Sequence, residues 1–268
     1  MDEDDTRTDE RERVRLAELS WPDVEAAFED GVDTIVLPLG ATEQHGPHLP
    51  LETDTRLATE LAERVARRLG DALVAPVIPL GPSREHEGFP GTISASPETL
   101  TALLEDYVAS FERQGFAQVV VLPTHGGSFP VVDAAFPDLA READVDVVAV
   151  TGLRRYMDLL EEGLQEAGID VAEPIVHAGA SETAMVLAIA PERVAEDLPE
   201  GYTNEVSAAA LFAEGVETHA ENGVLGDARP ATAEAGETLL EHVANAHAAY
   251  ISDEFAALDD ARYPKENE

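Results

Sequence analysis

The 268-residue sequence contains no cysteine and only one lysine, Lys265, so the other sixteen of its 17 basic residues are arginines. The absence of cysteine excludes disulfide bonds, cysteine-ligated zinc sites and thiol catalysis. No apolar run approaches the roughly 18 residues that a transmembrane helix needs. The charged N-terminus lacks the apolar segment of a secretory signal. We therefore expect a cytoplasmic protein.

The charge is strongly one-sided, with 55 acidic residues against 17 basic ones and a formal net charge of -38. Such a charge argues against sequence-independent binding to nucleic acid or to an anionic membrane, because both are negative. A hydrophobic content of 44% excludes a disordered acidic tail. The composition indicates a halophilic protein, whose surplus carboxylates concentrated salt would screen. The alternative is an acidic protein with a basic partner, but the even spread of the acidic residues favours the first interpretation.

Short apolar runs alternate with helical patterns along the chain. Strands are predicted at 34–39, 73–78, 118–122 and 145–150, and helices at 21–30, 54–69, 97–114, 153–167, 182–190 and 233–258. This alternation predicts an α/β fold, a three-layer α-β-α arrangement with a mostly parallel central sheet. No linker or change of composition divides the chain. We therefore predict a single domain over 14–260, with an acidic flexible arm at 1–13 and a tail at 261–268.

Ligands of such sheets bind beyond the carboxyl ends of the strands, and five histidines fall in loops: His45, His48, His86, His125 and His177. In the first loop, Glu43 and His45 are two residues apart on extended backbone, so their side chains point the same way. Asp54 follows where the next helix begins. Glutamate, histidine and aspartate together suit zinc, manganese or iron(II). Taken singly, Asp54 also fits a plain helix N-cap, and Glu43 and His45 fit a solvated polar loop.

The second loop runs from Leu122 to Ser128 and places His125 at the end of a strand. Gly126 and Gly127 allow close backbone approach, and their amides, near a helix N-terminus, could hold an anion or oxyanion. We predict that Gly126, Gly127 and Ser128 bind substrate. An ordinary glycine turn with an incidental histidine is the alternative. A dinucleotide site fits poorly, because neither of the glycine-rich phosphate motifs is present.

Two further loops carry polar residues. His177 and Glu182 stand at a helix start, where they could be a proton shuttle and a base or metal ligand, although Glu182 also fits a dipole-stabilising acid. The loop around His86 is interpreted as a substrate-binding loop or as a structured turn. With Asp54 able to bridge, the four loops predict a centre of two metals about 3.5–4 Å apart. The residues therefore favour a metal-dependent hydrolase.

The same loops resemble the creatininase family of amidohydrolases. The matching segments are EQHGPHLP with Asp54, FPGTIS at 89–94, HGG at 125–127, HAG with Glu182-Thr, and the stretch 223–237, so that the resemblance covers about residues 20 to 255. It implies a creatininase-like fold with two divalent ions of zinc, manganese or iron. By position, it implies that Glu43 and His125 bind one ion and His45 the other, with Asp54 bridging both. It also implies a homo-oligomer, a hexamer built from dimers.

The resemblance implies an amide hydrolysis in which His177 moves a proton to the leaving nitrogen and Glu182 acts beside the metals as ligand or base. One departure concerns Gly126 and Gly127, where true creatininases carry Tyr-Glu and the glutamate binds the second metal. Glu182 or water must then serve. The aromatic residues that cap creatinine are not evident either, since the single tryptophan, Trp21, is far from the loops. Creatinine is thus disfavoured as substrate.

Two other branches of the family share the His-Gly-Gly form. One is the archaeal deformylase of a formylaminopyrimidine ribosyl phosphate in riboflavin and deazaflavin coenzyme synthesis. The other is the peptidase that trims the mycofactocin precursor peptide. The halophilic composition suggests an archaeal host and favours the deformylase, whose substrate phosphate Arg84, Arg154 or Arg155 could bind. A metal- or ligand-binding homologue without turnover is the non-enzymatic alternative.

Overall fold

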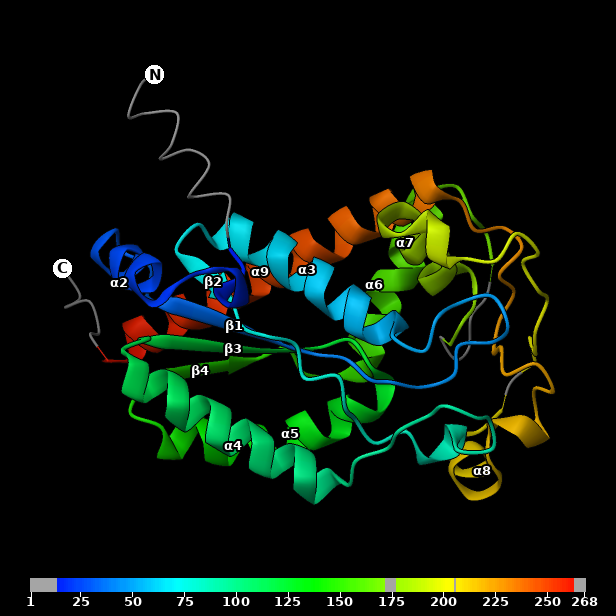
Figure 1. The fold of residues 1–268 in the computed structure, drawn as a ribbon, viewed down its shortest axis with the longest axis horizontal. Coiled ribbons are helices and arrows are strands. Elements are labelled where there is room, and N and C mark those ends of the chain that lie inside the picture. Colours follow the sequence, from blue (N-terminus) through cyan, green and yellow to red (C-terminus); the bar gives the residue numbers. More distant parts are fainter. Residues whose placement is uncertain (1–13, 172–176, 205, 263–268) are drawn as a thin grey trace.

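The computed structural model describes residues 14–171, 177–204 and 206–262 (Figure 1). The predicted arm at 1–13 and residues 263–268 of the predicted tail lie outside this part of the chain. A parallel four-stranded sheet forms the centre, with the order β2-β1-β3-β4. The strands are β1 (Thr34–Leu39), β2 (Ala72–Val74), β3 (Gln118–Pro123) and β4 (Asp146–Ala149). The predicted fold class is confirmed.

The helices cover both faces of the sheet (Figure 1). They are α2 (Trp21–Glu29), α3 (Thr53–Leu69), α4 (Pro97–Gln114), α5 (Phe129–Glu142), α6 (Leu153–Glu166), α7 (Ala180–Ile189), α8 (Ala208–Glu214) and α9 (Ala233–Arg262). Among the helices that the structure describes, none is long and apolar enough to cross a membrane.

Alternation along the strands divides the core into two layers, because successive side chains of a strand point to opposite faces. Val36 and Val120, which are paired in the register of β1 and β3, face α3, α6, α7 and α9. Ile35 and Val119 face α4 and α5 on the other side. Both layers are therefore filled by the same apolar runs that predicted the strands.

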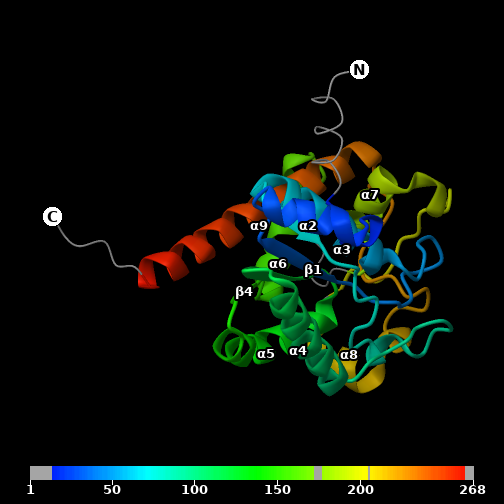
Figure 2. The ribbon, with the colours of Figure 1, turned by 60° about the vertical axis from the view of Figure 1, so that its left-hand side comes forward.

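Some elements differ in length from the prediction. The second strand ends at Val74 and not at residue 78, because the regular ladder with β1 is interrupted between the Ala75 N–H, which donates to the carbonyl of Val36, and the Ile78 N–H, which donates to the carbonyl of Pro38. Only an isolated bridge between Leu39 and Ile78 continues the pairing. The last helix extends to Arg262, whose guanidinium pairs with Asp146 at the start of β4. Figure 2 shows the C-terminal part of α9 extending beyond the body of the molecule.

Candidate metal centre

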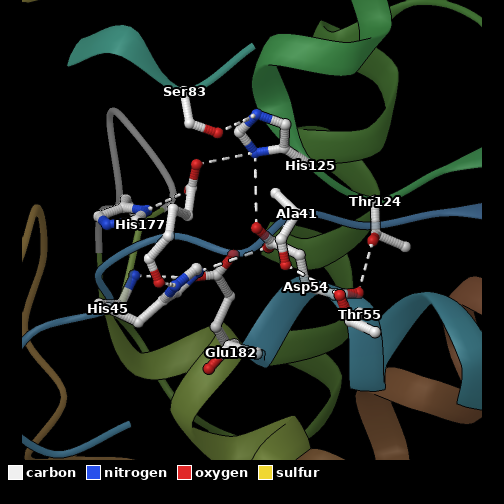
Figure 3. Close-up of polar contacts among 12 residues, drawn as sticks. Ala41, His45, Asp54, Thr55, Ser83, Thr124, His125, His177 and Glu182 are labelled. Carbon is white, nitrogen blue, oxygen red and sulfur yellow. Dashed lines mark hydrogen bonds and ion pairs between the residues drawn. The ribbon is translucent and has the colours of Figure 1, made fainter. Parts of the chain in front are cut away.

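The predicted ligands come from three different loops and meet beyond the carboxyl ends of β1 and β3. Glu43 and His45 lie in the loop after β1, and Asp54 is in the first turn of α3. His125 follows β3 directly, and Glu182 is in the first turn of α7. Figure 3 shows His45, Asp54, His125 and Glu182 pointing toward a common centre. All five side chains are buried, with at most 6% of each residue exposed.

Hydrogen bonds hold the start of α3 against this sheet edge. The Thr124 hydroxyl, one residue before His125, donates to the backbone carbonyl of Asp54 at 3.1 Å. The Thr55 hydroxyl donates to the carbonyl of Ala41 at 2.9 Å. These contacts place Asp54 between the loops that follow β1 and β3.

The five residues form two groups that share Asp54. In the first, His125 Nδ1 lies 3.4 Å from Glu43 Oε2 and 3.5 Å from Asp54 Oδ2. In the second, His45 Nε2 lies 3.4 Å from Asp54 Oδ1 and 3.6 Å from Glu182 Oε2. Each oxygen of the Asp54 carboxylate therefore faces a different group, which is the arrangement that a bridging carboxylate requires.

The separations suit metal ligation. Two ligand atoms about 2.1 Å from a tetrahedral zinc ion are about 3.4 Å apart. Glu43 Oε2, His45 Nε2 and Asp54 Oδ2 are buried without a hydrogen-bond partner among the described residues. Buried polar atoms are normally satisfied, and leaving them unsatisfied is costly. The residues present therefore fit two divalent cations.

Backbone carbonyls fix the histidine tautomers. His125 Nε2 donates to the carbonyl of Pro82 at 2.8 Å, and His45 Nδ1 donates to the carbonyl of Glu43 at 3.2 Å. The nitrogen that donates to the backbone thus faces outward in each ring, and the nitrogen available for a metal faces the carboxylates. Metal-binding histidines typically show this outer hydrogen bond, because it orients the ring and increases the basicity of the ligand nitrogen.

The carboxylates dominate the electrostatics of the site. Burial lowers the pKa of His45, but Asp54 and Glu182 outweigh burial and raise it to about 10. Burial likewise lowers the pKa of His125, and the charge of Glu43 raises it well above its usual value. The acidic groups therefore bind cationic charge strongly, and a divalent ion can take the place of the protons.

A family model described as creatinine amidohydrolase matches residues 17–251. The chain belongs to the creatininase family. Its relatives in this family are hydrolases of C–N amide bonds, and the predicted enzyme class is confirmed at this level.

Curated relatives cover most of the chain. The mycofactocin precursor peptide peptidase of Mycolicibacterium smegmatis is 36% identical over 225 residues, which cover 80% of this chain and 82% of the relative. The creatinine amidohydrolase of Pseudomonas putida is 32% identical over 263 residues, which cover 90% of this chain and 97% of the relative.

A crystal structure of creatininase matches with a TM-score of 0.78 at 29% identity, over 91% of this chain and 98% of that one. Two further creatininase structures are described as Zn-Zn type and as the Mn form. The similar structures thus carry zinc or manganese, in agreement with the metals predicted here.

Gly127, where the resemblance to creatininases implied a missing glutamate, leaves no room for a side chain. A Cβ atom there would lie 2.0 Å from the carbonyl oxygen of Pro82 and 2.7 Å from His125 Nε2. This creatininase-family chain instead brings Glu182 to His45. The Ala178 N–H donates to Glu182 Oε2 at 2.5 Å, which ties the carboxylate to the turn after His177. Ala178 adopts a positive φ of 56°, which is uncommon for a residue other than glycine.

The predicted substrate residues lie around the first ligand group. His86 Nε2 is 3.6 Å from Glu43 Oε1, so His86 joins the cluster. Gly126 and Gly127 are partly exposed, whereas Ser128 is fully buried and its hydroxyl has no hydrogen-bond partner in the described part of the chain. The geometry leaves the substrate-binding role of Ser128 a prediction.

The arginines considered for a substrate phosphate are on the surface. Arg154 pairs with Asp158 at 2.7 Å and Arg155 with Glu162 at 2.8 Å, and both ion pairs lie on α6. Arg84 is exposed in the turn that precedes His86.

His177 also approaches the ligand atoms. Its Nδ1 lies 3.6 Å from Glu43 Oε1, and Glu43, His45 and His177 form a third group whose ligand atoms are within 4.8 Å of one another. Gln44, which the sequence did not predict to be a site residue, contacts His86 and His177. Its position between Glu43 and His45 is a signal for such a role, but an amide side chain does not titrate.

Proposed function

We propose that the protein is a dinuclear metal amidohydrolase with the residues in the roles that the sequence predicted. Glu43, His125 and Asp54 hold one divalent cation, and His45, Asp54 and Glu182 hold the other. The observation that carries the proposal is the division of the Asp54 carboxylate, whose two oxygens face two different histidines at 3.4 and 3.5 Å.

Bound in this way, the two cations would polarise the substrate carbonyl and lower the pKa of the attacking water. The proton transfers fall to His177 and Glu182. His177 Nδ1 lies 3.6 Å from Glu43 Oε1, and Glu182 Oε2 lies 3.6 Å from His45 Nε2, so both side chains border the same buried volume. Burial lowers the pKa of His177 well below its usual value, which keeps the ring neutral.

Two substrate classes are candidates. The first is the formamide of a formylaminopyrimidine ribosyl phosphate, which the halophilic, archaeal composition favours. The second is an amide bond of a short peptide, which the similarity to mycofactocin precursor peptide peptidases favours. Creatinine is disfavoured, because Gly127 has no room for the glutamate of true creatininases.

Metal analysis followed by a substrate panel tests the proposal. The protein is purified in concentrated salt, loaded with zinc or manganese, and assayed for formate release, for peptide cleavage and for creatinine hydrolysis. Formate release supports the first substrate class, and cleavage of the mycofactocin precursor peptide supports the second. Two bound metals without hydrolysis of any amide would contradict the enzymatic function and favour the binding homologue.

The composition and the family resemblance support four further proposals about the whole protein. These are a single catalytic domain over 14–260, a homo-oligomer built from dimers, a cytoplasmic location and a halophilic archaeal source.

A further inference from the structure

Gln44 is a buried amide whose orientation two backbone groups determine. The Gly46 N–H donates to Gln44 Oε1 at 3.0 Å, and Gln44 Nε2 donates to the carbonyl of Gly223 at 3.0 Å. A backbone N–H can only donate and a carbonyl oxygen can only accept. These contacts therefore establish which end of the side-chain amide is the nitrogen.

This same nitrogen faces two histidines. Gln44 Nε2 lies 2.7 Å from His177 Nε2 and 2.9 Å from His86 Nδ1. A carboxamide nitrogen carries two hydrogens and does not accept; one hydrogen goes to the carbonyl of Gly223, and the other goes to His177 Nε2, the nearer of the two ring nitrogens. The hydrogen of the neutral His177 ring is then on its other nitrogen, Nδ1.

The His177 ring is thus the reverse of the metal-ligand histidines. His45 and His125 donate outward to carbonyls and turn toward the carboxylates the nitrogen that a metal would bind. His177 accepts from outside and turns an N–H inward, toward Glu43 Oε1 at 3.6 Å. An imidazole nitrogen that carries a hydrogen has no lone pair for a metal.

The fold provides a place for the amide at Gly223. This residue has a φ of +77°, and a Cβ atom there would lie 2.0 Å from Gln44 Oε1. The side chain of Gln44 therefore occupies space that any residue other than glycine at 223 would need. His177 is held on its other side by ring contacts, with centroids 4.4 Å from His45 and 4.2 Å from His86.

We propose that Gln44 is a positioning residue that holds His177 in the tautomer with its Nδ1–H directed into the metal centre. His177 is then a hydrogen-bond donor to the substrate and not a third histidine ligand. This inference rests on the proposed function and specifies how His177 is oriented within it. The inward N–H of His177 stabilises the negative charge that develops on the carbonyl oxygen as water attacks.

The tautomer can be measured directly. Protein labelled with ¹⁵N in the histidine rings is prepared metal-free and zinc-loaded, and long-range ¹H–¹⁵N spectra assign the protonated nitrogen of each ring. The His177 signals are identified by their loss in His177→Asn. We expect the Nδ1–H tautomer in both preparations. An Nε2–H tautomer, or zinc coordination by His177, would overturn the proposal without any activity measurement.

Variants test the role of the amide. Gln44→Met has a similar shape without a donor, and we expect kcat to fall about tenfold or more, with KM within about twofold and the zinc content unchanged. Gln44→Glu presents an acceptor to His177 Nε2 and should shift the ring to Nε2–H. The matched control is Gln118→Met, which removes a hydrogen bond to Thr34 at the far end of β3.

Unchanged kcat in Gln44→Met, or a parallel loss of zinc, would contradict the positioning role. If Gln44→Met does not fold, the wild-type tautomer and Gln44→Glu still decide the question. If the wild type hydrolyses no amide, the proposed function fails, and the tautomer measurement still decides whether Gln44 orients His177.

Discussion

Glu182→Gln tests whether the carboxylate of α7 holds the second cation. Glu182 Oε2 lies 3.6 Å from His45 Nε2, and Asp54 Oδ1 lies 3.4 Å from the same ring nitrogen. The pKa of His45 gives the scale of the effect. Burial lowers that pKa, yet Asp54 and Glu182 raise it from 6.5 to about 10. This corresponds to about 5 kcal/mol of net stabilisation for a single positive charge.

If the two carboxylates share this stabilisation about equally, removal of one costs about 2.5 kcal/mol, or about 70-fold in affinity, for a monovalent charge. A divalent ion should lose at least as much. We therefore expect Glu182→Gln to bind the second zinc ion at least about 70-fold more weakly, while the first ion, held by Glu43, Asp54 and His125, is retained.

Competition with a chelator, followed by elemental analysis of metal per chain, measures both sites. The control is Glu142→Gln, which removes an exposed carboxylate at the end of α5 and should leave both affinities unchanged. Two zinc ions of unaltered affinity in Glu182→Gln would refute the assignment of Glu182 as a ligand.

Three further predictions follow from the fold. Burial lowers the pKa of His247 to about 4 in the folded protein, against 6.5 for an exposed histidine. The buried neutral ring therefore contributes to stability above pH 6.5, and this contribution is lost as the pH falls to 4. Between pH 6.5 and pH 4, the free energy of unfolding measured with urea should fall by about 3 kcal/mol more in the wild type than in His247→Phe. An equal fall in both proteins would contradict this prediction. Gly127→Ala must displace the Pro82 carbonyl, so this variant should lose bound metal and at least about 1–3 kcal/mol of stability. The control Gly126→Ala should remain as stable as the wild type, because no described atom lies within 4 Å of the added Cβ. Because the net charge is -38, the midpoint of thermal unfolding should rise steeply with KCl concentration, and a midpoint independent of salt would contradict the halophilic interpretation.

The local pattern of apolar and polar residues in the sequence predicted much of the fold. The apolar runs at 34–39 and 118–122 correspond to β1 and β3 within one residue, because buried parallel strands are continuous apolar segments. The length of the second strand was overestimated, since its apolar residues continue to Ile78 but the regular ladder with β1 stops after Val74 and only the isolated bridge at Ile78 follows. No range was predicted for α5, although a helix was expected to begin near Ser128, and the short helix α8 was not predicted.

The candidate site was predictable to the extent that it depends on strand ends. Residues that follow parallel strands meet at one edge of the sheet, which brought His125 into the same prediction as Glu43 and His45. The role of Gln44 was not predictable, because it depends on contacts with residues 133 and 179 positions further along the chain. The lack of room at Gly127 likewise depends on the distant carbonyl of Pro82.

The most direct test of the account is an anomalous diffraction measurement at the zinc edge on crystals of the zinc-loaded protein. We predict two peaks per chain, one between Glu43 and His125 and one between His45 and Glu182, with an oxygen of Asp54 bound to each. Asp54→Ala crystals should show neither peak. A single peak in the wild type, or two peaks retained in Asp54→Ala, would contradict the bridged two-metal centre.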